Sequence, residues 1–223
     1  DILYGIKGNT VGCTDDPDKT VSYATCHDNY TLHDRAIVAG ISDEAKIEKM
    51  NQLANSVVFT SQGTTFMLAG EELLRTKVVY DTNGNPVEAK DETTGKPLGR
   101  PEVSGNSYSS SYKTNEIDYS RKISHESLFE NYKKLIQFKQ NTAELHYGKN
   151  DVSKVTTTML DNKTCIKVSL NNNYQIYHVQ GASKGYEINL SGYEIVYDSL
   201  GKTRDESTLK LEAFESIILK KIV

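Results

Sequence analysis

The stretch Thr20-Val-Ser-Tyr-Ala-Thr-Cys-His-Asp28 decides the fold that this sequence predicts. It begins as a short run in which apolar and polar residues alternate, which favours a β-strand. It ends in adjacent His27 and Asp28, followed by Asn29, so polar groups lie at the carboxyl end of the predicted strand. In α/β barrels, catalytic and substrate-binding side chains lie at that end. Taken alone, these three residues also fit an ordinary turn, because Asp and Asn are common turn formers.

A helix and a second strand are predicted after this stretch. Ser42 is a candidate cap, and apolar residues recur from Ile47 to Val58 with the spacing of a buried helix face. The run 64–69 is short and largely apolar, as expected for a strand covered on both faces. It ends in the polar Gly70-Glu71-Glu72. Strand, helix and strand in this order predict part of a parallel βα sheet.

Three other segments complete the first part of the chain. Residues 1–19 are rich in Gly, Asn and Asp and are expected to form a loop. Residues 78–115 contain several Gly and Pro residues, and a loop of that length is expected to be either functional or disordered. Residues 125–142 have the apolar side of an amphipathic helix.

The pattern changes after residue 148. Short strand-like runs follow one another, separated by turn residues, which predicts an antiparallel β-sandwich. These runs are 155–159, 165–170, 174–179, 186–190, 193–197 and 214–219. We therefore place a domain boundary near residue 148.

Composition argues against several classes of partner. The net charge is -4, and no cluster of Lys and Arg offsets it, so no nucleic-acid partner is expected. No apolar run approaches the length of a membrane span, so no membrane partner is expected. The three Cys residues include no CxxC pair, which gives neither a disulfide framework nor a zinc spacing. The acidic loop around Asp15, Asp16 and Asp18 lacks the DxDxDG calcium pattern and is interpreted as a solvated turn.

Four segments together resemble one family of enzymes. The string Tyr23-Ala-Thr-Cys-His-Asp-Asn-Tyr-Thr-Leu-His-Asp34 resembles the last catalytic motif of the α-amylase superfamily, and most of all its pullulanase, or type I starch-debranching, branch. Residues 63–77 are similar to the eighth barrel strand of that family and the loop after it. Residues 106–119 are similar to a segment that begins Asn-Ser-Tyr and ends Asn-x-Ile-Asp-Trp. The helix from His125 would be the eighth barrel helix.

This resemblance implies an α/β plus all-β architecture. Residues 1–148 would be the C-terminal segment of a catalytic (β/α)8 barrel, with strands 7 and 8 and their helices. The barrel would be incomplete, because two parallel strands cannot close one. Residues 149–223 would be the β-sandwich domain that follows the barrel in this superfamily.

The resemblance also implies a function and a set of site residues. The family members are retaining glycosidases that cleave α-1,6-glucosidic bonds in pullulan, starch or glycogen, with one carboxylate as nucleophile and another as acid and base. Asp28 would be the third family carboxylate, which stabilises positive charge on the sugar ring in the transition state, and His27 would bind hydroxyls of that sugar. Asn115 and Asp118 would line the sugar cleft, and Tyr108 is a candidate to stack on a sugar ring. The expected partner is therefore an α-glucan.

Two departures from the family pattern bear on specificity. The family usually has Pro-Asp where this chain has Ser111-Tyr112, and Trp where it has Tyr119. An α-1,4-acting enzyme of the same superfamily therefore stays open as an alternative. Glu71 and Glu72 are interpreted as structural residues rather than as a catalytic acid pair.

The catalytic set of the family is incomplete in this sequence. The Arg-x-Asp nucleophile motif and the acid motif have no counterpart, and the first residue is Asp1 rather than Met. We expect a piece of a larger enzyme that is inactive alone and that pairs either with the missing N-terminal part or with a copy of itself. No cofactor is expected for the piece, whereas calcium occurs in parent enzymes of this superfamily. The sequence does not indicate a compartment.

A binding module is the remaining alternative. In that interpretation the sandwich holds carbohydrate by itself, on a surface platform of aromatic side chains. Five tyrosines are available for it, namely Tyr174, Tyr177, Tyr186, Tyr193 and Tyr197. The absence of Trp counts against it, because large aromatic faces suit sugar stacking best.

Overall fold

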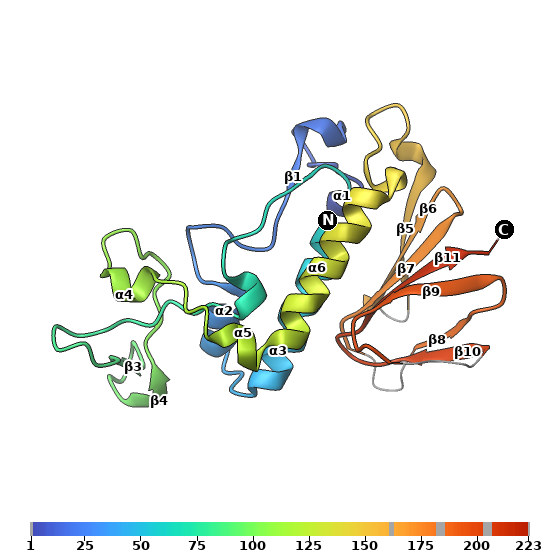
Figure 1. Ribbon diagram of the computed structural model, residues 1–223. Coiled ribbons are helices and arrows are strands. Elements are labelled where there is room, and N and C mark those ends of the chain that lie inside the picture. Colours follow the sequence, from blue (N-terminus) through green and yellow to red (C-terminus); the bar gives the residue numbers. More distant parts are fainter. Residues whose placement is uncertain (1, 161–162, 182–185, 203–206, 223) are drawn as a thin grey trace. The chain divides into compact units, whose positions relative to one another are not determined.

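The computed structural model describes residues 2–160, 163–181, 186–202 and 207–222 (Figure 1). The chain forms two compact units. Unit 1 comprises Asp1–Tyr23, Gln52–Phe66 and Glu130–Val223, and unit 2 comprises Ala24–Asn51 and Met67–Phe129. Helices occur together with antiparallel sheets, so this part of the predicted fold class is confirmed. Within the described ranges, no helix has the length and apolar character that a membrane span requires.

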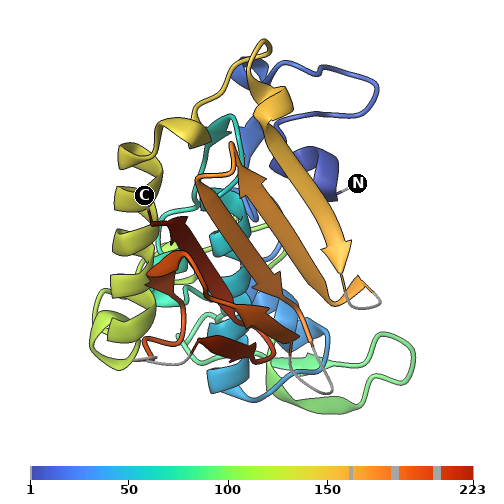
Figure 2. The ribbon, with the colours of Figure 1, turned by 90° about the vertical axis from the view of Figure 1, so that its right-hand side faces the viewer.

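Unit 1 contains a five-stranded antiparallel sheet (Figure 2). In spatial order its strands are β5 (Val155–Leu160), β6 (Cys165–Leu170), β7 (Tyr174–Val179), β11 (Ser216–Lys221) and β9 (Tyr193–Asp198). Two further strands, β8 (Tyr186–Asn189) and β10 (Thr208–Leu211), form an antiparallel pair. All six predicted strand runs are present, and the last begins two residues later than predicted. β10 was not predicted, although Leu209 and Leu211 alternate with exposed polar residues as in a half-buried strand.

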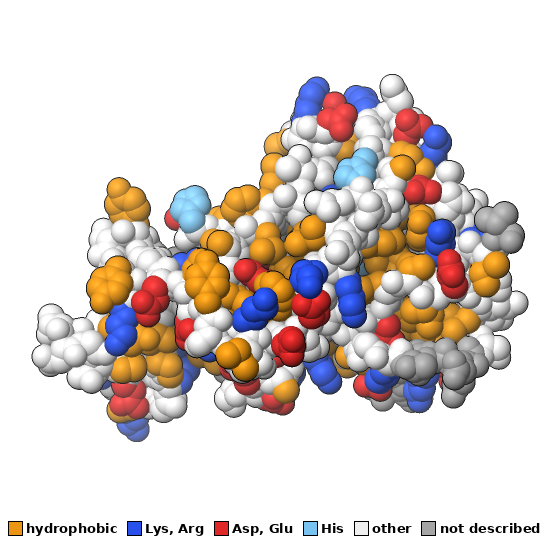
Figure 3. Space-filling view, in the orientation of Figure 1, with side chains coloured by type: hydrophobic (Ala, Val, Ile, Leu, Met, Phe, Trp, Pro, Cys, Tyr) orange, Lys and Arg blue, Asp and Glu red, His pale blue; other side chains and the backbone are white. Residues whose placement is uncertain are grey.

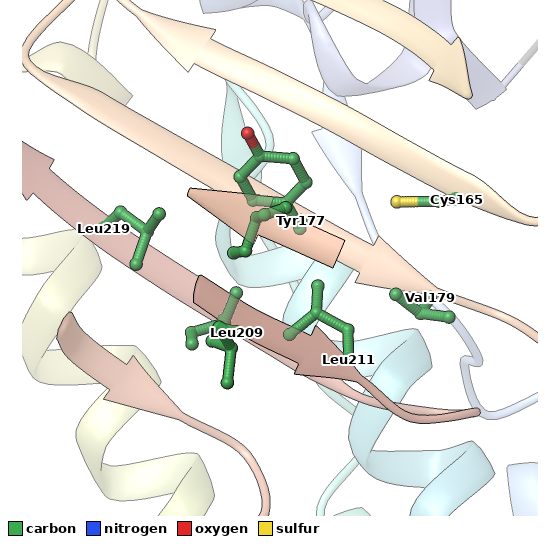
Figure 4. Close-up of a cluster of buried hydrophobic side chains, with 8 residues drawn as sticks. Cys165, Tyr177, Val179, Leu209, Leu211 and Leu219 are labelled. Atoms are coloured by element: carbon green, nitrogen blue, oxygen red, sulfur yellow. The ribbon is translucent and has the colours of Figure 1, made fainter. Parts of the chain in front are cut away.

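One face of the five-stranded sheet packs against the pair β8–β10. Side chains alternate along a strand, so every second residue shares a face. The shared cluster is apolar and buried, and Figure 4 shows it between strands of both sheets. Its members are Cys165, Tyr177, Val179, Ile188, Leu209, Leu211, Ile217 and Leu219.

The other face of this sheet packs against helical residues of unit 1. These belong to the C-terminal parts of α3 (Glu44–Phe59) and α6 (Glu126–Asn141). Phe59 and Tyr132 join the two helices edge to face, with ring centroids 5.9 Å apart, and Phe138 packs in the same way on Tyr174 of β7 at 5.5 Å. Both helices were predicted, because their apolar residues recur with a helical period.

Unit 1 also holds the one parallel strand pair among the described residues, β1 (Val21–Ser22) with β2 (Thr64–Thr65). The strands predicted at 20–28 and 64–69 are therefore too long. Pairing ends at Ser22 and Thr65, and residues 23–28 and 66–69 are not strand in the structure. The loop predicted for 1–19 is also wrong in part, since α1 (Ile2–Ile6) lies there and buries Ile6.

Unit 2 is built from short elements. It contains α2 (Leu32–Val38), the first turns of α3, α4 (Tyr112–Asn115), α5 (Arg121–Ser124) and a hairpin of β3 (Glu88–Lys90) and β4 (Pro97–Pro101). The long loop predicted for 78–115 is therefore wrong in part, because this segment contains β3, β4 and α4. The hairpin buries Ala89 and Val103, and a bridge between Val78 and Val103 closes its base.

Candidate functional site

All five candidate residues belong to unit 2, and His27 and Asp28 lie on an open turn. His27 Nε2 lies 3.5 Å from Asp28 Oδ2, and the two side chains are 84% and 75% exposed. The carboxylate and the imidazole are therefore accessible to a ligand.

The turn that carries them is fixed through its backbone. Asn29 adopts a positive φ, a conformation that Asn tolerates better than most residues, and its Oδ1 accepts a hydrogen bond from Arg35 at 3.3 Å. Thr31 then caps α2, since its Oγ1 accepts from the backbone N–H of Asp34 at 3.1 Å. These bonds hold the chain on the C-terminal side of Asp28.

A buried lysine holds the same turn from inside. Lys77 is 2% exposed, and its Nζ donates to the carbonyl oxygens of Asn29 at 2.6 Å and His27 at 3.5 Å. Burial lowers the pKa of Lys77 below its usual value, and the nearby Asp34 carboxylate opposes that change. The sequence analysis missed Lys77, because no local pattern shows that a lysine is buried.

Asp34 anchors the segment that contains Lys77. The Asp34 carboxylate is fully buried and accepts hydrogen bonds from Thr76 Oγ1 at 2.5 Å and from the Lys77 backbone N–H at 2.8 Å. His33 Nδ1 lies 3.1 Å from the same carboxylate. Helix α2 and residues 76–77 are thus joined by charge-assisted bonds, which are shorter and stronger than neutral ones.

Asn115 and Tyr108 lie on a neighbouring part of unit 2. Asn115 Nδ2 donates to the carbonyl of Ser107 at 2.8 Å, next to Tyr108, and Arg75 donates to the carbonyl of Asn115 at 2.6 Å. Tyr108 itself is 95% exposed. The amide of Asn115 therefore shapes the loop, while the Tyr108 ring is free to contact a ligand.

Asp118 borders a hollow in unit 2 of about 190 Å³. Asp118 Oδ1 accepts hydrogen bonds from the hydroxyl of Ser120 at 2.6 Å and from the backbone N–H of Ser120 at 2.9 Å. These bonds lower the pKa of Asp118. The carboxylate is exposed and ionised at neutral pH, so it can accept hydrogen bonds from sugar hydroxyls. The hollow is lined by Leu73, Arg75, Thr76, Val78, Tyr80, Lys113, Glu116, Ile117, Asp118 and Arg121.

Glu44 organises the charges beneath this region. It pairs with Arg121 at 3.0 Å, with His33 at 3.2 Å and with His125 at 3.7 Å. Burial raises the pKa of Glu44, but His33 and Arg121 outweigh burial, so its pKa lies below the usual value. Glu44 therefore fixes Arg121, whose Nε donates to the carbonyl of Leu73 at 3.1 Å.

The five predicted residues form two groups. His27 and Asp28 make up one, and Asn115, Asp118 and Tyr108 belong to the other. No hydrogen bond or ion pair joins Asp28 to Asn115 or Asp118, all three of which the structure describes. The consecutive residues 75–77 contact both groups, since Arg75 holds the carbonyl of Asn115 and Lys77 holds the turn around Asp28.

Charged side chains of both signs surround the candidate residues. Acidic and basic side chains are interspersed on the face shown in Figure 3. Among the described residues, no group of three or more His, Cys, Asp or Glu could hold a metal ion. Asp15, a member of the acidic loop, instead pairs with Lys149 at 2.8 Å. The site offers one accessible carboxylate beside an imidazole, an arrangement that can stabilise positive charge and bind hydroxyl groups.

Comparison with known proteins gives a consistent set of relatives. No family model matches the chain. Pullulanase A of Streptococcus pneumoniae is 30% identical over an alignment of 151 positions, which covers 57% of this chain and 12% of that protein. The structure of a pullulanase from Bacillus acidopullulyticus is 25% identical with a TM-score of 0.74, over 99% of this chain and 26% of that one. A pullulanase from Anoxybacillus sp. LM18-11, solved with maltotetraose, is 19% identical with a TM-score of 0.71, over 97% of this chain and 30% of that one. The chain thus spans a minor part of the length of each relative.

Proposed function

We propose that this chain is the C-terminal part of a type I pullulanase of the α-amylase superfamily. Such an enzyme is a retaining glycoside hydrolase that cleaves α-1,6-glucosidic bonds in pullulan, starch or glycogen. The similarity to two bacterial pullulanases supports this proposal. The observation that carries the proposal is the exposed Asp28 beside His27, on a turn that a buried lysine holds. The relatives support glycoside hydrolysis in general, and we propose the preference for α-1,6 bonds in addition.

Each candidate residue has a proposed role. Asp28 lies beside the sugar whose ring becomes cationic, because an anion stabilises such a transition state most strongly where the substrate excludes water. His27 donates a hydrogen bond to a hydroxyl of the same sugar. Asn115 and Asp118 line the cleft around a neighbouring sugar, and Tyr108 stacks on a ring. The relative solved with maltotetraose supports an α-glucan as the ligand.

The proposed architecture is the end of a (β/α)8 barrel, residues 1–148, followed by a β-sandwich, residues 149–223. The parallel pair β1–β2, linked through α3, supports the first part. The two antiparallel sheets around one apolar cluster support the second part. Either the preceding part of the same enzyme or a second copy of the chain would pair with the barrel segment.

A carbohydrate-binding sandwich is less well supported. Tyr177 and Tyr197 are only 6% and 4% exposed, so they belong to the interior rather than to a surface platform. Tyr174 packs on Phe138, and the hydroxyl of Tyr193 accepts a hydrogen bond from Gln175 at 2.6 Å. These tyrosines do not offer a row of free ring faces.

The isolated chain is proposed to be inactive, and an assay on pullulan tests this. Asp28 provides one carboxylate, whereas retaining hydrolysis needs a nucleophile and an acid as well. We expect no release of reducing sugar above a blank reaction. Sustained turnover by the 223-residue chain would refute the proposed inactivity.

The role of Asp28 is tested in a longer parent protein. Asp28→Asn should lower kcat by roughly 100-fold or more, as expected for the loss of a group that stabilises transition-state charge. The matched control is Glu92→Gln, an exposed carboxylate in the turn of the β3–β4 hairpin. The control should cleave pullulan at the parental rate. Equal rates for the two variants would remove Asp28 from the mechanism.

A further inference from the structure

We infer that Lys77 is a positioning residue, which sets the orientation of Asp28 and His27 toward a bound glucan by holding the two carbonyl groups on either side of Asp28. The inference rests on the proposed function of this site. In this role Lys77 acts through the backbone of its neighbours and not by contact with the sugar.

The geometry assigns Lys77 to the backbone and leaves the Asp28 carboxylate free. Lys77 Nζ lies 2.6 Å from Asn29 O and 3.5 Å from His27 O, so one ammonium group bonds to the residue before and the residue after Asp28. Fixing both neighbouring carbonyls fixes the direction in which the Asp28 side chain leaves the backbone. The partner of the Asp28 carboxylate is His27, so Asp28 keeps lone pairs for a ligand.

Lys77 is costly to bury, which argues against a chance contact. An ammonium group loses strong hydration on burial and is tolerated only where hydrogen-bond acceptors replace the water. The two carbonyl groups are such acceptors, and the buried Asp34 carboxylate compensates the charge. A neutral side chain of the same length would avoid this cost but would leave the carbonyls of the turn without this donor.

Lys77 is itself held in place by its own neighbours. The Asp34 carboxylate bonds to the backbone N–H of Lys77 at 2.8 Å and to Thr76 Oγ1 at 2.5 Å. Arg75, two residues earlier, donates to the carbonyl of Asn115 at 2.6 Å. Residues 75–77 therefore bond to both groups of candidate residues within unit 2.

The test compares Lys77→Met with Lys139→Met in the complete chain. Lys139 is the matched control, because it is also a buried lysine that donates to a carbonyl, that of Ser61 at 2.6 Å, but it belongs to unit 1. Maltotetraose is titrated into each 15N- and 13C-labelled protein, and the NMR signals of residues 26–29 and the His27 ring are followed. Thermal unfolding of each variant is measured in parallel.

Lys77→Met should weaken maltotetraose binding at least 10-fold and should shift or broaden the signals of residues 26–29. Lys139→Met should leave the affinity and the signals of residues 26–29 unchanged, even if its melting temperature falls as much as that of Lys77→Met. Lys77→Arg, which keeps a cationic donor, should recover part of the lost affinity. If Lys77→Met does not fold, Lys77→Gln takes its place, since it retains an N–H donor without the charge.

Two outcomes would overturn the inference. One is unchanged affinity and unchanged signals of residues 26–29 in the Lys77 variant. The other is an equal loss of affinity in the Lys77 and Lys139 variants, which would indicate general destabilisation. If the unmodified chain binds no maltotetraose, the proposed glucan site fails in this chain, and the signals of residues 26–29 in the variants still decide whether Lys77 orders the turn.

Discussion

His178 has both ring nitrogens bonded inside unit 1. Nε2 lies 3.0 Å from Thr60 Oγ1 and Nδ1 lies 2.9 Å from Ser216 Oγ, so the ring joins the end of α3 to strand β11. No carboxylate is among these partners, and burial lowers the pKa of His178 to about 3. The ring is therefore neutral in the folded protein over the whole neutral range.

This pKa predicts an acid-sensitive contribution to stability. The unfolded chain binds a proton on this histidine near its ordinary pKa of 6.5, whereas the folded chain binds it only near pH 3. The contribution of His178 to the free energy of unfolding is therefore fully present above pH 6.5. It decreases as the pH drops from there toward 3, and the loss is about 2 kcal/mol at pH 5. Urea unfolding measures the free energy of unfolding at pH 7 and at pH 5. The difference between these two values should be smaller for His178→Gln than for the unmodified chain.

The control for this prediction is Leu211→Ala. Leu211 is fully buried in the same unit, and its truncation should cost about 2–5 kcal/mol without removing a titratable group. The control should keep the full difference between pH 7 and pH 5. If His178→Gln and the control lose the same free energy of unfolding between pH 7 and pH 5, His178 is not the source of the acid sensitivity.

At the element scale, the parallel pair β1–β2 depends on a close approach at Gly63. Gly63 has φ +82°, and a Cβ at this position would lie 2.9 Å from the carbonyl oxygen of Pro17 and would clash with Thr20 Oγ1. Thr20 O accepts the hydrogen bond from Thr64 N at 3.0 Å that begins the ladder. A side chain at position 63 would therefore push the two strands apart.

Gly63→Ala should be more destabilising than Gly12→Ala. Gly12 has a nearly equal φ of +81° but nothing within 4 Å of its added Cβ, so it reports the backbone strain alone, about 1–2 kcal/mol. Gly63→Ala should add a steric cost of about 1–3 kcal/mol to this value. Chemical denaturation of the two variants measures the difference, and equal losses would mean that the contact at Gly63 relaxes freely.

The β3–β4 hairpin was not predicted from the sequence. Its strands are short and mostly exposed, so the residues around Ala89 carry no apolar alternation. What closes the hairpin is a turn in which Asp91 accepts hydrogen bonds from the backbone and hydroxyl of Thr94 at 2.7 Å. Turn bonds and one buried Ala89 decide its formation, and neither gives a periodic signal.

At the scale of the whole molecule, protection from hydrogen exchange should be uneven. Strands β7 and β11 are flanked on both sides and buried on both faces, with Ile176 and Ile218 at most 1% exposed. The β3–β4 hairpin has one neighbour for each strand. Amides that open only on global unfolding exchange most slowly, so those of β7 and β11 should be the slowest.

Hydrogen exchange with mass spectrometry tests this order. Peptides that cover residues 174–179 and 216–221 should retain deuterium-free amides long after peptides that cover 88–101 have exchanged. The edge strands β5 and β9 should fall between them. Faster exchange in β7 than in the hairpin would mean that the five-stranded sheet is not the most stable part of the chain.

The sequence by itself determined the two long helices and the six strand runs of the second half. These features are local, because helical period, strand alternation and turn chemistry are written in neighbouring residues. The tertiary structure alone decided that β1 and β2 pair over only two residues, that Lys77 and Asp34 are buried, and that residues 75–77 hold both groups of candidate residues. A charged side chain enters the interior only when distant parts of the chain supply its partners, and those partners are set by the fold rather than by the adjacent sequence.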